Sequence, residues 1–280
     1  MGTPPLNLQA PLVTSRELLT QPLLPLVWDV EPLISRGDRV IMFGEFGSFK
    51  SWILLHLAWH LAAGVQWLDT FTIREQRRVL YVDEEMNERT LRRRGKRLAD
   101  GAGISGEPPV AFLSRAGVRF DAYGAGRLLS YLQAQKFHTQ IIIVEALRRV
   151  LMGNENEASD LAAFWRNLEP VSRLGITIII SHHMTKPPAQ GKRAARYRAS
   201  GSTDILAGSD ASFAIERVSE DTSRITGIKA RDDVELRPFL VQLGDGGDRQ
   251  APMWLRKARV EASRALTPEE SRDVLLQPVI

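Results

Sequence analysis

Nine consecutive residues near the start of the chain have the types and spacing of a phosphate-binding loop. They are Gly44, Glu45, Phe46, Gly47, Ser48, Phe49, Lys50, Ser51 and Trp52. In the pattern G-x-x-x-x-G-K-[ST], backbone N–H groups surround the phosphates, the lysine reaches the β- and γ-phosphates, and the hydroxyl holds Mg²⁺. The loop departs from this pattern at one position, where Phe49 replaces glycine, so the backbone there must accommodate a Cβ atom. We therefore predict a site for ATP and Mg²⁺, with a chance strand-to-helix turn as the alternative.

Carboxylates that can serve such a site follow two apolar runs. Glu145 comes directly after Ile141–Val144, and Asp83, Glu84 and Glu85 close a second run. Open α/β sheets place their ligands at the carboxyl ends of the strands, so Glu145 can orient a water bound to Mg²⁺ and one of the three acids can polarise the attacking water. The alternative for Glu145 is an ordinary polar residue after a buried strand. For the three acids it is a solvated loop that caps the next helix.

The loop and the acids need strands that end beside them, and the sequence predicts such strands. Short apolar runs alternate with helical stretches, as in parallel strands that helices cover on both faces. We predict strands at 40–43, 78–83, 110–113, 140–144 and 177–181, and helices at 51–63, 88–98, 124–135 and 159–174. Shorter strands at 212–217, 224–228 and 239–243, with turns around Gly227 and at 244–247, extend the same sheet in an antiparallel manner. The fold class is α/β, with a mostly parallel central sheet flanked by helices and with antiparallel edge strands.

The composition indicates a globular protein with a full core. Of the 280 residues, 44% are hydrophobic and 25% are charged, which is enough apolar material for one large α/β domain. Cysteine is absent, so disulfides and thiolate metal sites are excluded and a reducing cytoplasm is the expected location. The most apolar stretch, 52–65, is shorter than the roughly 20 residues that span a bilayer, so we expect no membrane contact. We predict an N-terminal arm at 1–36, an ATPase domain at 37–260 and a C-terminal tail or helix at 261–280.

Positive charge is concentrated in one segment, 184–203. It contains no acidic residue and five basic ones, which are Lys186, Lys192, Arg193, Arg196 and Arg198. Since the net charge of the whole chain is only +4, the remainder carries a net charge of −1. The segment also contains two prolines and two glycines, which predicts a long irregular loop, and such loops are usually functional. The alternative is a solvated loop without a partner.

Two pairs of histidines allow different interpretations. His182 and His183 end an apolar strand beside the predicted phosphate site, where an imidazole can bond a phosphate oxygen. His56 and His60 are four residues apart on the helix that follows the phosphate loop. No third ligand for zinc is evident near them, so we expect packing residues.

Six segments in order resemble a known family. They are the phosphate loop ending in FKSW, VLYVDEEMNERTLRRR, IIIVEALRRVLMGNENEASD, IIISHHMTKP, RASGSTDILAGSDAS and the later Lys229-Ala230-Arg231. The chain resembles the RecA-like AAA-type P-loop ATPases grouped with the RepA hexameric replicative helicases, and more distantly the DnaB-type helicases. The resemblance implies a RecA-like fold over about two thirds of the chain.

The resemblance also implies roles for individual residues. Lys50 and Ser51 would bind phosphate and Mg²⁺, Glu85 would activate water, and Glu145 would serve the metal in place of the usual Asp. His183 would sense the γ-phosphate, and Lys229 with Arg231 would reach the site of a neighbouring subunit. The loops at this edge face the channel of a RecA-like ring. Lys192, Arg193, Arg196 and Arg198 would therefore follow a nucleic-acid backbone, with Tyr197 as a stacking face.

These features together predict an ATPase that acts on single-stranded DNA as a homo-oligomeric, hexameric replicative helicase. The alternative is a nucleotide-switched binding protein, such as a recombination mediator, loader or defence regulator, that does not unwind DNA. A small-molecule kinase is disfavoured because the sequence shows no Arg-rich lid for a second phosphate substrate.

Overall fold

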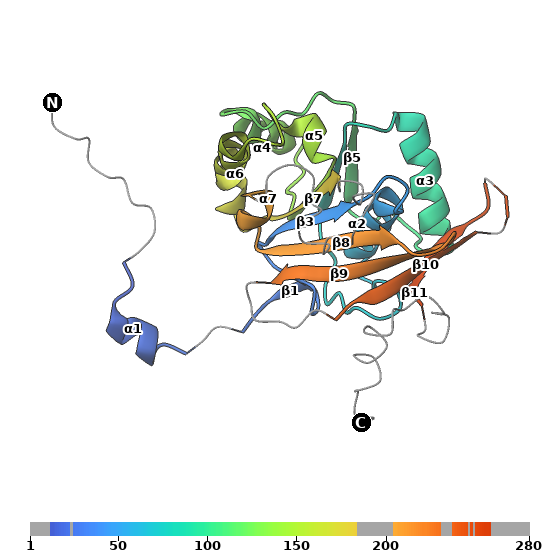
Figure 1. The fold of residues 1–280 in the computed structure, drawn as a ribbon, viewed down its shortest axis with the longest axis horizontal. Coiled ribbons are helices and arrows are strands. Elements are labelled where there is room, and N and C mark those ends of the chain that lie inside the picture. Colours follow the sequence, from blue (N-terminus) through green and yellow to red (C-terminus); the bar gives the residue numbers. More distant parts are fainter. Residues whose placement is uncertain are drawn as a thin grey trace, which may run out of the picture.

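A twisted sheet flanked by helices organises the molecule (Figure 1). The computed structural model describes residues 12–22, 25–183, 204–230, 237–245, 247–248 and 250–258. Within these ranges the main sheet has nine strands in the order β11-β10-β9-β8-β3-β7-β6-β4-β5. The parallel strands are β3 (Arg39–Gly44), β4 (Val79–Asp83), β5 (Val110–Ser114), β6 (Ile141–Glu145), β7 (Thr177–His183) and β8 (Ala211–Arg217). The antiparallel strands are β9 (Thr222–Ala230), β10 (Phe239–Asp245) and β11 (Met253–Lys257).

Helices cover both faces of this sheet, as the apolar strands predict. The longer helices are α2 (Lys50–Ala63), α3 (Glu88–Gly101), α4 (Gly124–Ala134) and α6 (Ala158–Ser172), and the short ones are α5 (Leu147–Val150) and α7 (Asp204–Ala207). Alternate residues of β3 enter different cores: Val40 and Met42 pack in the cluster with α2, whereas Ile41 and Phe43 pack in the cluster with α4 and α6. The predicted three-layer α/β architecture is confirmed.

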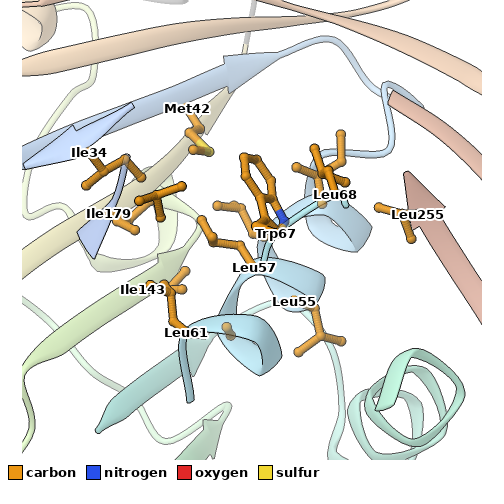
Figure 2. Close-up of a cluster of buried hydrophobic side chains, with 14 of the residues drawn as sticks. Ile34, Met42, Leu55, Leu57, Leu61, Trp67, Leu68, Ile143, Ile179 and Leu255 are labelled. Atoms are coloured by element: carbon orange, nitrogen blue, oxygen red, sulfur yellow. The ribbon is translucent and has the colours of Figure 1, made fainter. Parts of the chain in front are cut away.

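The core on the α2 side has this apolar helix at its centre, and Leu91 and Leu98 of α3 pack in the same cluster. Figure 2 shows Leu57 and Leu61 of α2 with Ile143 of β6 and Ile179 of β7, beside the buried indole of Trp67. Nearly all of α2 is buried, including residues on both of its sides. Burial of this kind holds the helix firmly, and with it the phosphate loop at its N-terminus.

The segment before the main sheet divides into two parts. Helix α1 (Ser15–Thr20), closed by a capping box between Thr14 and Glu17, has no buried residue and lies away from the sheet (Figure 1). By contrast, β1 (Trp28–Val30) and β2 (Ile34–Ser35) pair with each other, and Val30 and Ile34 are fully buried in the core. Residues 28–35, which the sequence prediction placed in the arm, thus pack with the domain.

Two details of the late strands differ from the prediction. The turn predicted around Gly227 is wrong, because Gly227 lies within β9 opposite Phe213, beside an irregularity in the register of β8 and β9. Glycine inside a strand often marks such a bulge rather than a turn. Strand β11 was not predicted. Among the described residues, no helix is both long and apolar enough to cross a bilayer.

Candidate functional site

The phosphate loop connects β3 to α2 at the carboxyl end of the parallel strands. Gly44 is opposite His183 of β7 and Ile215 of β8, and a Cβ atom on it would lie 2.6 Å from the Ile215 carbonyl oxygen. Only glycine fits there. Gly47 has a φ of 78°, in the left-handed region that glycine adopts without strain. The loop therefore needs both glycines for its path, and α2 begins directly after it at Lys50.

Phe49 adopts the backbone conformation of the glycine that it replaces. Its φ is 62° and its ψ is 13°, which is unusual for a bulky residue. The Arg217 guanidinium lies 4.6 Å from the centre of the Phe49 ring, and its Nη1 is 3.5 Å from the Gly47 carbonyl oxygen. The buried Ser223 hydroxyl donates to the Ser48 carbonyl oxygen at 2.8 Å. Arg217 and Ser223, at the β8–β9 hairpin, thus support the loop from outside.

Glu145 is brought against the phosphate loop by β6. Its Oε1 accepts hydrogen bonds of 3.0 Å from both the Ser51 and the Ser181 hydroxyls. Its side chain is almost completely buried, and this burial raises the pKa of Glu145, although Lys50 and the two hydroxyls oppose the effect. A hydroxyl and a carboxylate side by side make an oxygen donor set of the kind that Mg²⁺ takes.

Asp83 ends β4 directly opposite Glu145 in the sheet. Its Oδ1 accepts from the backbone N–H groups of Glu85 at 2.9 Å and Met86 at 2.7 Å. Its Oδ2 is buried and has no hydrogen-bond partner among the described residues. Burial raises the pKa of Asp83 to about 6, although the two backbone N–H groups oppose this rise. Such an unsatisfied buried oxygen is a feature of functional sites.

Glu85 is half-exposed and lies between two groups that can carry positive charge. Its Oε1 is 3.8 Å from His183 Nε2 and 3.8 Å from Arg149 Nε. His183 is the main cause that holds the pKa of Glu85 below its usual value, and Arg149 and Lys50 add to the effect. Glu85 therefore stays ionised at neutral pH and can accept a proton.

These positions bring most of the predicted site together. Lys50, Ser51, Glu85, Glu145 and His183 meet at the carboxyl ends of β3, β4, β6 and β7. In the same loop Glu45 is half-buried, whereas the Phe46 side chain is fully open to solvent. Trp52 faces α3 instead, where Arg94 lies 4.7 Å from the centre of its ring. Its place is consistent with packing between α2 and α3.

Of the remaining predicted residues, the structure describes Lys229. The Lys229 ammonium donates to the carbonyl oxygens of Leu206 at 2.7 Å, Ala207 at 3.1 Å and Ser209 at 2.6 Å, within its own subunit. Arg231 and four basic residues of the predicted nucleic-acid loop lie outside the described residues: Lys192, Arg193, Arg196 and Arg198.

The second histidine pair is part of the interior. The rings of His56 and His60 are 3.9 Å apart, and both side chains are buried. Burial lowers the pKa of each, and that of His56 most strongly, so both are neutral at pH 7. His60 Nδ1 donates to the His56 carbonyl oxygen at 2.8 Å. The pair lies on α2, away from Lys50.

The site fits a nucleotide with Mg²⁺. Buried Lys50 lies at the N-terminus of a 14-residue helix, where backbone N–H groups and a lysine ammonium attract phosphate. The adjoining Ser51 and Glu145 oxygens suit the metal.

Comparison with known proteins agrees with this geometry. A family model described as an AAA domain matches residues 3–189, a range that holds the phosphate loop, Glu85, Glu145 and His183. No curated protein matches the chain. Among solved structures, a KaiC-like protein from the hyperthermophilic archaeon Pyrococcus horikoshii superposes with a TM-score of 0.53 at 11% sequence identity. The match covers 82% of this chain and 94% of that chain. At this identity the match shows the fold alone, and with the family match it confirms a RecA-like P-loop NTPase fold.

Proposed function

The chain belongs to the AAA domain family and is an AAA-type P-loop ATPase, and on this premise we propose that it is a motor that acts on single-stranded DNA as a ring-forming, hexameric replicative helicase. The observation that carries the proposal is the position of His183. This residue lies 3.8 Å from Glu85 at the end of β7, and the basic segment 184–203 begins directly after it. In this proposal His183, which contacts the γ-phosphate, directly precedes in sequence the basic segment 184–203, which binds DNA.

The residues of the site divide the work of hydrolysis. Lys50 balances the charge of the β- and γ-phosphates, and Ser51 with Glu145 holds Mg²⁺. Bound Mg²⁺ supplies charge neutralisation at the phosphate oxygens. Glu85 accepts the proton of the attacking water, and its depressed pKa keeps it ionised for that role. His183 donates to a γ-phosphate oxygen, so its contact with Glu85 changes when the phosphate leaves.

The choice of single-stranded DNA rests on the charge pattern of the sequence. Lys192, Arg193, Arg196 and Arg198 can follow a phosphate backbone, and Tyr197 between them can stack on a base. Contacts of this kind depend little on sequence and strongly on salt, because each phosphate contact releases counterions.

The ring is proposed because Arg231 comes directly after β9 in the sequence, and β9 belongs to the antiparallel strands of the sheet. An arginine supplied to a neighbouring phosphate site is worth on the order of 10³-fold or more in rate. Lys229 is held by three carbonyl oxygens of its own subunit, so Arg231 is the better candidate for this role.

The function is tested by the ATPase rate with and without single-stranded DNA, together with strand displacement on a forked substrate. A motor raises its turnover with DNA and displaces the strand. A nucleotide-switched binding protein would hydrolyse ATP slowly and bind DNA but would displace no strand. This result would favour the switch over the helicase. A turnover that DNA leaves unchanged, with no DNA binding, would contradict both.

The DNA-binding segment has its own test. Replacing Lys192, Arg193, Arg196 and Arg198 together by Ala should weaken single-stranded DNA binding and flatten its salt dependence by roughly 0.7 per lost phosphate contact. Basal ATPase activity should persist. An unaltered salt slope would show that the segment is merely solvated.

The shared site is tested by mixing subunits. Arg231→Ala subunits keep Lys50, and Lys50→Ala subunits keep Arg231, so some interfaces of a mixed ring combine both intact residues. Turnover should partly return from two inactive preparations. Verified mixed oligomers without any turnover would count against a site shared between subunits.

A further inference from the structure

The turns that follow β4 and β5 are joined by hydrogen bonds between charged side chains and main-chain groups. The Arg115 guanidinium donates to the Glu85 carbonyl oxygen from Nε at 3.0 Å and from Nη2 at 2.6 Å. In the opposite direction, the Glu84 carboxylate accepts from the backbone N–H groups of Gly117 at 3.2 Å and Val118 at 2.8 Å. We call these four hydrogen bonds, formed by Arg115 and Glu84 with the facing main chain, the β4–β5 clasp.

The clasp closes around the residue that faces the phosphate loop. Glu84 points toward the turn after β5, whereas the carboxylate of its neighbour Glu85 lies near His183 and Arg149. The main chain between them is also held by the Asp83 carboxylate, which accepts from the Glu85 N–H. Both the N–H and the C=O of Glu85 are thus bonded to charged side chains, one from each strand.

This double hold matters because Glu85 itself is loosely placed. Its carboxylate is half-exposed, and Arg149 and His183, its two neighbours that can carry positive charge, are 3.8 Å away, beyond ordinary hydrogen-bond length. A general base must be within hydrogen-bond reach of the proton that it takes, and a misplacement of about 1 Å can cost about a hundredfold in rate. A fixed main chain limits how far the carboxylate can move.

We propose that Arg115 and Glu84 are positioning residues for ATP hydrolysis: the β4–β5 clasp holds the main chain of Glu85 so that its carboxylate stays directed at the attacking water. The inference rests on the proposed role of Glu85 as the base and adds residues outside the phosphate-binding set. Arg115 is exposed and Glu84 is half-exposed, so neither contributes to the apolar core. Their hydrogen bonds act on a turn beside the site and not on the fold.

Arg115→Ala is the principal test, in the full chain. Turnover should fall about tenfold to a hundredfold while the KM for ATP and the melting temperature stay close to those of the unchanged protein. Arg115→Lys, which keeps the positive charge and a donor group but not the two-nitrogen fork, should recover part of the loss. The matched control is Arg92→Ala, which removes an exposed arginine paired with Glu88 on α3. Glu84→Ala removes the other half of the clasp and should lower turnover in the same way.

A double-mutant cycle separates positioning from a general structural effect. If Arg115 acts through Glu85, adding Arg115→Ala to Glu85→Gln should lower the residual turnover no further. Full additivity of the two losses would overturn the proposal, as would a fall in melting temperature that parallels the fall in turnover. Normal turnover in both Arg115→Ala and Glu84→Ala would overturn it too and leave the role of Glu85 intact. Normal turnover in Glu85→Gln alone would instead remove Glu85 from the reaction, and with it both claims.

Discussion

The parallel and antiparallel halves of the sheet are built on different principles. Strands β4 and β6 are buried along their whole length, and their polar residues Asp83 and Glu145 stand only at the carboxyl ends. Strand β10 and the first four residues of β9 alternate buried and half-buried residues, as strands with one covered face do, and the remainder of β9 is half-buried. Strands β4 and β6 therefore bring their carboxylates to one edge of the sheet, whereas the antiparallel strands carry polar groups along their length.

This difference in burial corresponds to different contributions of the two halves to the site. The parallel half supplies the groups that can react, because Asp83, Glu145 and His183 stand at the carboxyl ends of β4, β6 and β7. The antiparallel half supplies a support through Ser223 of β9, which donates to the Ser48 carbonyl oxygen, and Arg217, at the hairpin that joins β8 to β9, adds to it by stacking on Phe49. Substitutions in the first half should stop the reaction, and those in the second should only weaken the loop.

The largest expected effect is that of Lys50→Ala in the parallel half. ATP hydrolysis should be abolished and ATP binding weakened, because Lys50 is the cation that the loop offers to the β- and γ-phosphates. Turnover and nucleotide affinity are measured together with thermal unfolding, which should change little. Unchanged turnover would contradict the assignment of the phosphate loop.

Glu85→Gln should lower turnover by about 10²- to 10⁴-fold and leave ATP binding intact, since it removes the base but not the phosphate contacts. Glu88→Gln is the matched control, because Glu88 is an exposed acid of the same segment that pairs with Arg92. Equal losses in both variants would show that the loss does not depend on the position of the acid.

The pH dependence of stability separates the acids at the strand ends from the histidines on α2. Burial lowers the folded-state pKa of His56. Below about pH 6.5 the unfolded chain therefore binds a proton that the folded chain does not bind, so the free energy of unfolding decreases as the pH is lowered. Asp83 has the opposite sign, because its folded-state pKa of about 6 lets the folded chain bind a proton first. The free energy of unfolding of His56→Leu should therefore increase relative to that of the unchanged protein, by up to about 1.4 kcal/mol for each pH unit below pH 6. Denaturant unfolding at pH 5 to 7.5 measures the difference, and parallel curves would exclude a buried neutral His56.

Ser223→Ala tests the support from the antiparallel half. Removal of its hydroxyl leaves the Ser48 carbonyl oxygen without this donor, at a cost of about 1 kcal/mol. The KM for ATP should rise several-fold and kcat should change less. A loss of turnover as large as that of Glu85→Gln would erase the distinction between the two halves.

The smallest expected effect concerns the left-handed backbone of Phe49. Phe49→Ala keeps the unfavourable φ and loses the ring contact with Arg217, whereas Phe49→Gly loses the contact and relieves the backbone. The glycine variant should be the more stable of the two by about 1 kcal/mol, after its greater chain entropy in the unfolded state is included. Thermal or denaturant unfolding of the pair decides, and a more stable alanine variant would contradict strain at this residue.

The sequence predicted the parallel half more accurately than the antiparallel half, for a physical reason. Strands buried on both faces are continuous apolar runs, so β3, β4 and β6 were recognised to within one residue. In the other half, Gly227 has the composition of a turn but lies in a bulge of β9, and β11 mixes Trp254 with the charged Arg256 and Lys257. Half-covered strands carry a weaker pattern.

The sequence also predicted only part of the candidate site, namely the residues that a local pattern marks. Lys50, Ser51 and Glu145 follow from a local pattern, and the hydrogen bond between Ser51 and Glu145 brings two of them into contact. Arg217 and Ser223 were missed, because they reach the phosphate loop from about 170 residues away and no local pattern marks such a contact. Arg149 was missed because basic residues after a strand are common on surfaces.

Strand β5 has a consequence for the range of temperatures over which the protein can work. It lies at the edge of the sheet, it pairs with β4 alone among the described strands, and all five of its residues are only half-buried. Edge segments of this kind open at a lower free energy than the whole molecule, and amide hydrogen exchange detects the opening. Because Arg115 follows β5 directly, each such opening would release Glu85 while the rest of the fold stays intact. ATPase activity should therefore be lost reversibly at a temperature several degrees below the melting temperature of the protein.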